Sequence, residues 1–158
     1  MKTVLARQVL DHKDKLSTVK VLQASLVDLI DLALQGKQAH WNVVGPNFRS
    51  VHLQLDEVIA DTRSASDEVA ERIATLGTAA NGRANDVATA SRLTAYPDGF
   101  QTAPETVHLV ADRLATTIQA LREAIEHLES TDPVSQDLLI SVAARLEKHL
   151  WMVQAQEA

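Results

Sequence analysis

The 158-residue sequence contains no cysteine, which excludes disulfide bonds and thiolate metal sites. Any transition metal must therefore be held by imidazole and carboxylate groups, a ligand set that suits iron, manganese or zinc. Glycine (five residues), proline (four) and aromatic residues (3%) are also scarce. The chain is instead rich in Ala, Leu, Glu, Gln and Arg, whose side chains lose little freedom in a helix. This composition favours helices and makes extended β-structure difficult to build.

Long apolar stretches are missing as well. No segment approaches the ~20 apolar residues of a membrane span, and the first seven residues lack the apolar core of a signal peptide. We therefore expect a soluble, cytoplasmic protein without membrane contact, whose length fits one domain. The formal charge of −6 at pH 7 argues against broad binding of nucleic acids by the folded body.

Apolar residues recur at steps of three and four over four long stretches, and this periodicity predicts four helices. These stretches are residues 17–44, 47–76, 102–128 and 133 to near the C-terminus. Gly45-Pro46 separates the first two, and Asp132-Pro133 opens the last, with Asp132 as the expected N-cap. Residues 78–103 form a long connection with a short helix expected near 86–93.

Four long helices with a crossing connection between the second and third predict an all-α fold, a four-helix bundle of the ferritin-like type. We expect residues 1–16 to form an N-terminal tail and residues 17–158 to form the bundle. The sequence shows no internal repeat and no second domain.

Residues whose side chains can bind a metal ion recur along the helix predicted at 47–76. At 100° per residue, Asp56, Asp67 and Glu71 lie at about 40°, 60° and 100° from His52 around the helix axis. All four side chains therefore share one stripe, which packing alone does not explain. Each carboxylate taken singly is better explained as a solvated surface residue, but the whole set indicates a metal site.

The axial spacing of these residues predicts a dimer. Asp56 and Asp67 are eleven residues apart, about 16 Å along the axis, whereas metal–ligand bonds are only ~2 Å long. One helix therefore cannot bring both carboxylates to one ion. Two antiparallel copies about a two-fold axis would face His52 and Asp56 with the partner subunit's Asp67 and Glu71, giving two equivalent sites.

His40 lies near the end of the first predicted helix, just before the Gly45-Pro46 turn. Antiparallel packing of the first two helices would bring it next to His52. A lone histidine is usually a hydrogen-bonded core residue or a surface residue, so the proximity of His52 is what makes His40 a candidate ligand.

Three motifs in this region closely resemble the Dps family, the DNA-binding proteins from starved cells. They are KQAHWN at 37–42, His52-x-x-x-Asp56 and Asp67-x-x-x-Glu71. The resemblance spans roughly residues 17–155, and the five ligand positions keep the family's spacing without a substitution. It implies a hollow ferritin-like shell of twelve subunits, a homo-oligomer built from two-fold dimers.

The resemblance also implies a reaction. His40, His52 and Asp56 of one subunit would join Asp67 and Glu71 of its two-fold mate to form a ferroxidase site. Family members oxidise Fe(II) there, usually preferring hydrogen peroxide to dioxygen, and store the ferric mineral. Carboxylates stabilise Fe(III), while a few neutral imidazoles bind Fe(II) beforehand. We expect protection against oxidative stress, with zinc or manganese as surrogate ions.

Other residues receive weaker assignments from the resemblance. Trp41 is expected to pack at the dimer seam and, in the family interpretation, to quench oxidising equivalents near the iron. Asp137 best matches the position of the pore through which iron enters at a three-fold axis, and Asp132 is a second candidate. Pro133 stands where some relatives have another acid, and a solvated surface explains each acid equally well.

Two further signals are set aside. Glu105-x-x-His108 matches the element that other ferritin-like bundles use for a di-iron site within one subunit, but such a site needs two copies. A first-turn glutamate and an exposed histidine are the better interpretation. We also expect His149 to lie at the surface.

DNA binding is expected to be weak or absent at physiological salt. Residues 1–17 carry four basic residues against two acidic ones, and residues 154–158 carry no basic residue. Few phosphates would be neutralised per tail, and salt would weaken the contact quickly even when many tails act together. Association with the nucleoid stays open. The alternatives to a ferroxidase are a metal-dependent hydrolase that uses the same site and a DNA-compacting nucleoid protein.

Overall fold

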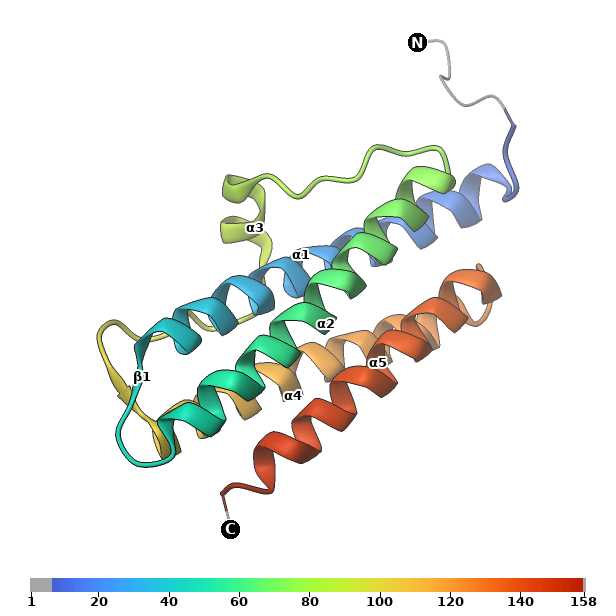
Figure 1. Cartoon of the computed structure of the whole chain (residues 1–158). Helices are drawn as coiled ribbons and strands as arrows, with labels where there is room; N and C mark the ends of the chain where they lie inside the picture. Colours follow the sequence, from blue (N-terminus) through green and yellow to red (C-terminus); the bar gives the residue numbers. More distant parts are fainter. Residues whose placement is uncertain (1–6, 158) are drawn as a thin grey trace.

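The computed structural model describes residues 7–157, which form two antiparallel helix pairs packed against each other (Figure 1). The elements are α1 (His12–Asn42), β1 (Val43–Val44), α2 (Phe48–Thr75), α3 (Ala84–Ala90), β2 (Gln101–Thr102), α4 (Ala103–Leu128) and α5 (Pro133–Gln154). The first pair is α1 with α2 and the second is α4 with α5, while α3 lies beside α1 within the long connection. The predicted all-α ferritin-like bundle, including the short helix in the connection, is confirmed.

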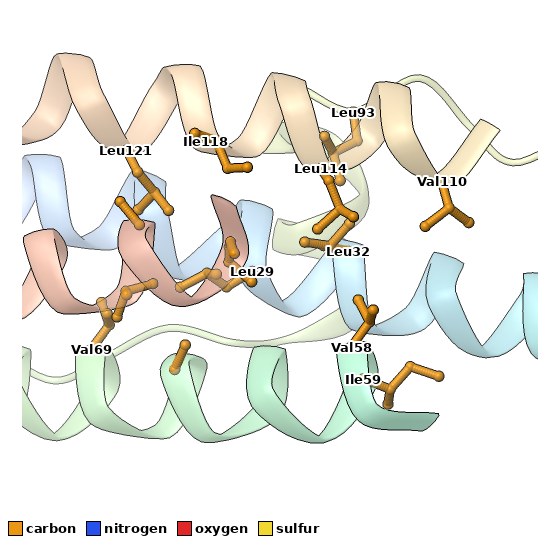
Figure 2. Packing of buried hydrophobic residues seen from close by; sticks show 14 of the residues in the cluster. Leu29, Leu32, Val58, Ile59, Val69, Leu93, Val110, Leu114, Ile118 and Leu121 are labelled. Atoms are coloured by element: carbon orange, nitrogen blue, oxygen red, sulfur yellow. The ribbon is translucent and has the colours of Figure 1, made fainter. Parts of the chain in front are cut away.

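The core lies between the four long helices. It is made of aliphatic side chains at three- and four-residue steps, among them Leu29, Val69, Leu114 and Leu121, which are at most 1% exposed (Figure 2). Full burial of such a side chain stabilises the folded state by about 1.5–3 kcal/mol. These residues therefore hold the two helix pairs in one rigid arrangement.

A tight turn joins α1 to α2. Gly45 and Asn47 adopt positive φ angles of 90° and 65°, which reverse the chain within four residues. Before this turn, β1 pairs in parallel with β2, so the end of α1 is tied to the start of α4. The α4 start is held by a capping box between Thr102 and Glu105.

The first helix begins earlier than expected. It starts at His12 rather than at residue 17, because Asp11 caps it through a 2.9 Å hydrogen bond from the Asp14 N–H. Lys15 also donates to the Gly77 carbonyl oxygen at 3.3 Å, which holds this first turn against the end of α2. The division into a tail and a bundle stays a prediction, and residues 1–6 lie outside the described residues.

The prediction that the Asp132 side chain caps α5 is wrong. Asp132 occupies the N-cap position, but its side chain makes no capping hydrogen bond. Its carboxylate instead accepts from Arg72 Nη2 at 2.7 Å and from the Ser135 hydroxyl. Asp132 is 2% exposed, and a guanidinium compensates a buried carboxylate better than a backbone amide does.

His149 is buried rather than at the surface. It is 5% exposed, and its Nε2 donates to the Asp61 carboxylate on α2 at 2.6 Å. The prediction was wrong because the bond joins α5 to α2, two helices that are distant in sequence. No helix among residues 7–157 is both long and apolar enough to cross a membrane.

Candidate metal centre

Two histidines meet where α1 ends and α2 begins. The rings of His40 and His52 stack with centroids 3.7 Å apart and an interplanar angle of 23°. Nδ1 of His40 lies 3.0 Å from the carbonyl oxygen of His52, and Nδ1 of His52 lies 2.9 Å from the carbonyl oxygen of His40. Because a carbonyl only accepts, each Nδ1 carries the proton, which assigns the lone pair to Nε2. Both imidazoles are thus oriented as neutral metal ligands.

Asp56 lies one turn after His52 and completes a cluster of three ligands. One ligand atom from each of His40, His52 and Asp56 lies within 4.8 Å of the others. His40 is 8% exposed, whereas the Asp56 side chain is 49% exposed, so the cluster opens to the outer face of the helix pair. Two imidazoles and a carboxylate can bind Fe(II), Mn(II) or Zn(II) and leave positions for further ligands.

The structure adds Lys37, which was not predicted as part of the site. Its Nζ lies 2.7 Å from Asp56 Oδ1. This hydrogen bond is the main reason that the pKa of Asp56 lies below its ordinary value; burial opposes it, and His40, Lys37 and His52 add favourable charge interactions. The signal in the sequence was its position three residues before His40, on the same side of α1.

Asp67 and Glu71 lie outside this cluster. Both are exposed and lie further along α2, which runs without a break from Phe48 to Thr75. The eleven residues between Asp56 and Asp67 therefore correspond to about 16 Å of helix. Glu71 lines a hollow of about 500 Å³ between α2 and α5 together with Asp137. Within one subunit, the structure brings together three of the five predicted ligands.

The other candidates fall into two groups. Trp41 is 68% exposed beside His40, and Asp137 is exposed on α5. Asp132, in contrast, forms an ion pair with Arg72. Its role in a pore stays a prediction, and the ion pair gives it a structural role as the alternative.

Glu105 and His108 do not form a metal site together. Glu105 caps α4 through Thr102, with the side-chain hydrogen bond from Thr102 as the main reason for its lowered pKa. His108 pairs with Glu157 at 3.1 Å and is exposed. The interpretation as a first-turn glutamate and an exposed histidine is confirmed.

Comparisons with known proteins agree with this fold. A family model described as a ferritin-like domain matches residues 19–157. The DNA protection during starvation protein of Agrobacterium fabrum is 33% identical over 98% of this chain and 96% of its own. The fine tangled pili major subunit of Haemophilus ducreyi is 41% identical over 86% of this chain and 72% of its own.

A solved structure, Dps from Microbacterium arborescens in the high iron form, covers 95% of this chain and 98% of its own. It superposes with a TM-score of 0.90 at 30% identity. The helix arrangement and these matches define a ferritin-like protein. Within that class, the chain belongs to the Dps family of mini-ferritins.

Proposed function

We propose that this chain oxidises Fe(II) and stores the ferric product, at sites shared between two subunits. The observation that carries the proposal is the convergence of His40, His52 and Asp56, with Asp67 and Glu71 exposed on the same face of α2. Membership in the Dps family supports iron as the substrate, and one family structure is described as a high iron form.

The ligands divide the chemistry between them. The two imidazoles, oriented by the reciprocal bonds to backbone carbonyls, bind Fe(II) as neutral ligands. Asp56 and the carboxylates of the partner subunit supply negative charge, which stabilises Fe(III) as it forms. Because the cluster of one subunit is open on its outer side, the partner's carboxylates can complete it while an oxidant still has access.

The exposed surface around the site supports a two-fold mate. Trp41, Phe48 and Leu53 are each at least 46% exposed near the cluster, and they are large apolar residues. Ala60 and Ala74 are exposed further along α2 and would allow another helix to approach closely. We propose that the dimer seam covers these residues and that dimers assemble into a shell of twelve.

The remaining assignments belong to the same proposal. Hydrogen peroxide is the proposed oxidant, since its reaction with Fe(II) at a protein site removes both reactants of hydroxyl-radical production. We place the shell in the cytoplasm, where it would protect against oxidative stress. Trp41 is the proposed quencher of oxidising equivalents, and Asp137 is proposed to line a pore. Hydrolysis and DNA compaction as the main function are not better supported than iron oxidation.

The direct test of this proposal is an anaerobic Fe(II) titration followed by a pulse of peroxide. We expect saturable binding of Fe(II), rapid formation of ferric absorbance after the pulse, and an iron-loaded particle of about twelve subunits by size exclusion with light scattering. A control without protein gives the background rate. Oxidation no faster than this background, or Fe(II) that does not bind, would contradict the proposed function.

DNA binding is expected to be weak, and the structure strengthens this expectation. Lys15, one of the basic residues of the N-terminal region, is held against Gly77 and Gln8 at the end of α2. The helix begins at His12, so residues 12–16 of the expected tail belong to α1. A gel-shift assay at about 150 mM salt should show no retained plasmid at low micromolar protein. Tight binding that is lost on deleting residues 1–10 would contradict this prediction.

A further inference from the structure

Lys37 lies where the proposed metal site needs a cation. We propose that its ammonium group competes with a metal ion for the Asp56 carboxylate. Lys37 thereby lowers the metal affinity of the cluster formed by His40, His52 and Asp56. The inference rests on the proposed function, because it concerns the same ligand cluster.

The geometry makes the competition direct. Lys37 Nζ lies 2.7 Å from Asp56 Oδ1, within hydrogen-bond distance, and Asp56 is the only carboxylate of the three-residue cluster. An ion bound to Asp56 at ~2 Å would lie within a few ångströms of the ammonium, so the two cations repel each other and compete for the same carboxylate. The Lys37 side chain is 22% exposed, so most of its stem is packed in the protein and the charge stays close after displacement.

The charge balance gives the sign of the effect. Lys37 lies on α1 and Asp56 on α2, so the carboxylate keeps its place beside His52 when Lys37 is replaced. Removing the ammonium therefore leaves the ligand intact and removes both its occupation of the oxygen and its repulsion of a divalent ion. Metal affinity should rise. If Lys37 only tied α1 to α2, its removal would lower the stability of the site and would not strengthen metal binding.

The test compares Lys37→Met with the wild-type protein in the assembled form. The probe is Co(II), titrated in the absence of peroxide and followed by its d–d absorption and by calorimetry. We expect Lys37→Met to bind Co(II) roughly tenfold more tightly than wild type. Lys37→Arg keeps the charge and should remain within about twofold of wild type.

Lys20→Met is the matched control for net charge. Lys20 is an exposed residue of the same helix, seventeen positions and about 25 Å before Lys37. Lys20→Met removes the same charge far from the cluster, so the Co(II) affinity of this variant should remain within about twofold of wild type. An equal increase in both methionine variants would overturn the proposal, because the effect would then be one of overall charge.

Failure of this inference can be distinguished from failure of the proposed function. Co(II) binding that is lost in His52→Gln but unchanged in Lys37→Met overturns the competition and leaves the metal site in place. An identical isotherm for His52→Gln and wild type contradicts the metal site itself. Circular dichroism and particle mass, measured on each variant, show that the fold and the assembly are retained.

Discussion

Co-expressing two inactive variants of this protein, so that their subunits pair at random, is expected to restore about a quarter of the wild-type rate of Fe(II) oxidation. The first variant, His52→Gln with Asp56→Asn, removes two ligands of the cluster seen in one subunit. The second, Asp67→Asn with Glu71→Gln, removes the two exposed carboxylates further along α2. Removing a residue that only hydrogen-bonds a metal ligand already lowers metal affinity or activity by about 10- to 100-fold. Each double variant removes two ligands, so its rate of Fe(II) oxidation should fall by at least about a hundredfold.

The expected recovery follows from the two-fold geometry. A mixed dimer has one site with both halves altered and one site with both halves intact. Random pairing makes half of the dimers mixed, so about one site in four is complete. A site confined to one subunit would show no recovery, because every subunit in the mixture carries a lesion.

The experiment needs subunits that pair at random. Co-expression of the two variants with different affinity tags, followed by purification over both, selects assemblies that contain both chains. Oxidation by peroxide is then followed by stopped-flow absorbance, with each variant alone as the control. Separately purified variants, combined without exchange, should remain inactive. Recovery in that sample, or none in the co-expressed sample, would contradict a site shared between subunits.

The second large effect concerns stability rather than activity. Asp132→Ala is expected to lower the free energy of unfolding by about 3 kcal/mol. It removes the buried acceptor of two hydrogen bonds, from Arg72 Nη2 and from the Ser135 hydroxyl, and leaves the guanidinium without the counter-charge of Asp132. Arg72 is only 16% exposed in its side chain, and Ser135 is fully buried. For a chain of this length, the midpoint of thermal unfolding should fall by roughly 6–12 °C at fixed subunit concentration.

The effect should depend on pH in a defined direction. Burial acts to raise the pKa of Asp132, but the hydrogen bonds from Ser135 and Arg72 outweigh it, and the pKa lies below the ordinary 3.8. A carboxyl whose pKa is lowered by folding stabilises the protein fully above the unfolded value. This stabilisation is lost as the pH falls through the folded pKa. The difference in the free energy of unfolding between wild type and Asp132→Ala should therefore be constant from about pH 5 to pH 7. It should shrink below about pH 3.8.

Asp137→Ala is the matched control, because Asp137 is exposed on the same helix. Its thermal midpoint should change little, while a role in iron uptake would appear as slower mineral formation at unchanged stability. If Asp132→Ala slowed iron uptake without lowering the midpoint, the ion pair would not be the main role of Asp132.

Much of this architecture could be predicted from the sequence because helices are governed by local rules. Apolar residues at steps of three and four indicated all four long helices, and the glycine and proline positions indicated where they end. The start of α1 was placed five residues too late. Asp11 was the signal for the true start, since an aspartate before a polar helical segment is a common N-cap.

The contacts between helices could not be predicted in the same way. His149 reaches Asp61, and Arg72 takes the carboxylate of Asp132 away from the helix end. Each of these bonds joins residues at least 60 positions apart. Such partners depend on how the helices are rotated against one another, and sequence periodicity defines only which face of each helix is buried.

By itself, the sequence determined the helix periods and the axial spacing of Asp56 and Asp67. That spacing requires a second subunit if both carboxylates are to bind one ion, because the rise per residue of an α-helix is constant. Only the tertiary structure decided that His40 and His52 orient each other through their backbone carbonyls and that Lys37 reaches Asp56. These contacts depend on the close approach of α1 and α2, where a Cβ on Gly36 would lie 3.0 Å from an Ile59 side-chain carbon. The packing of the core sets this distance, and no local rule of the sequence does.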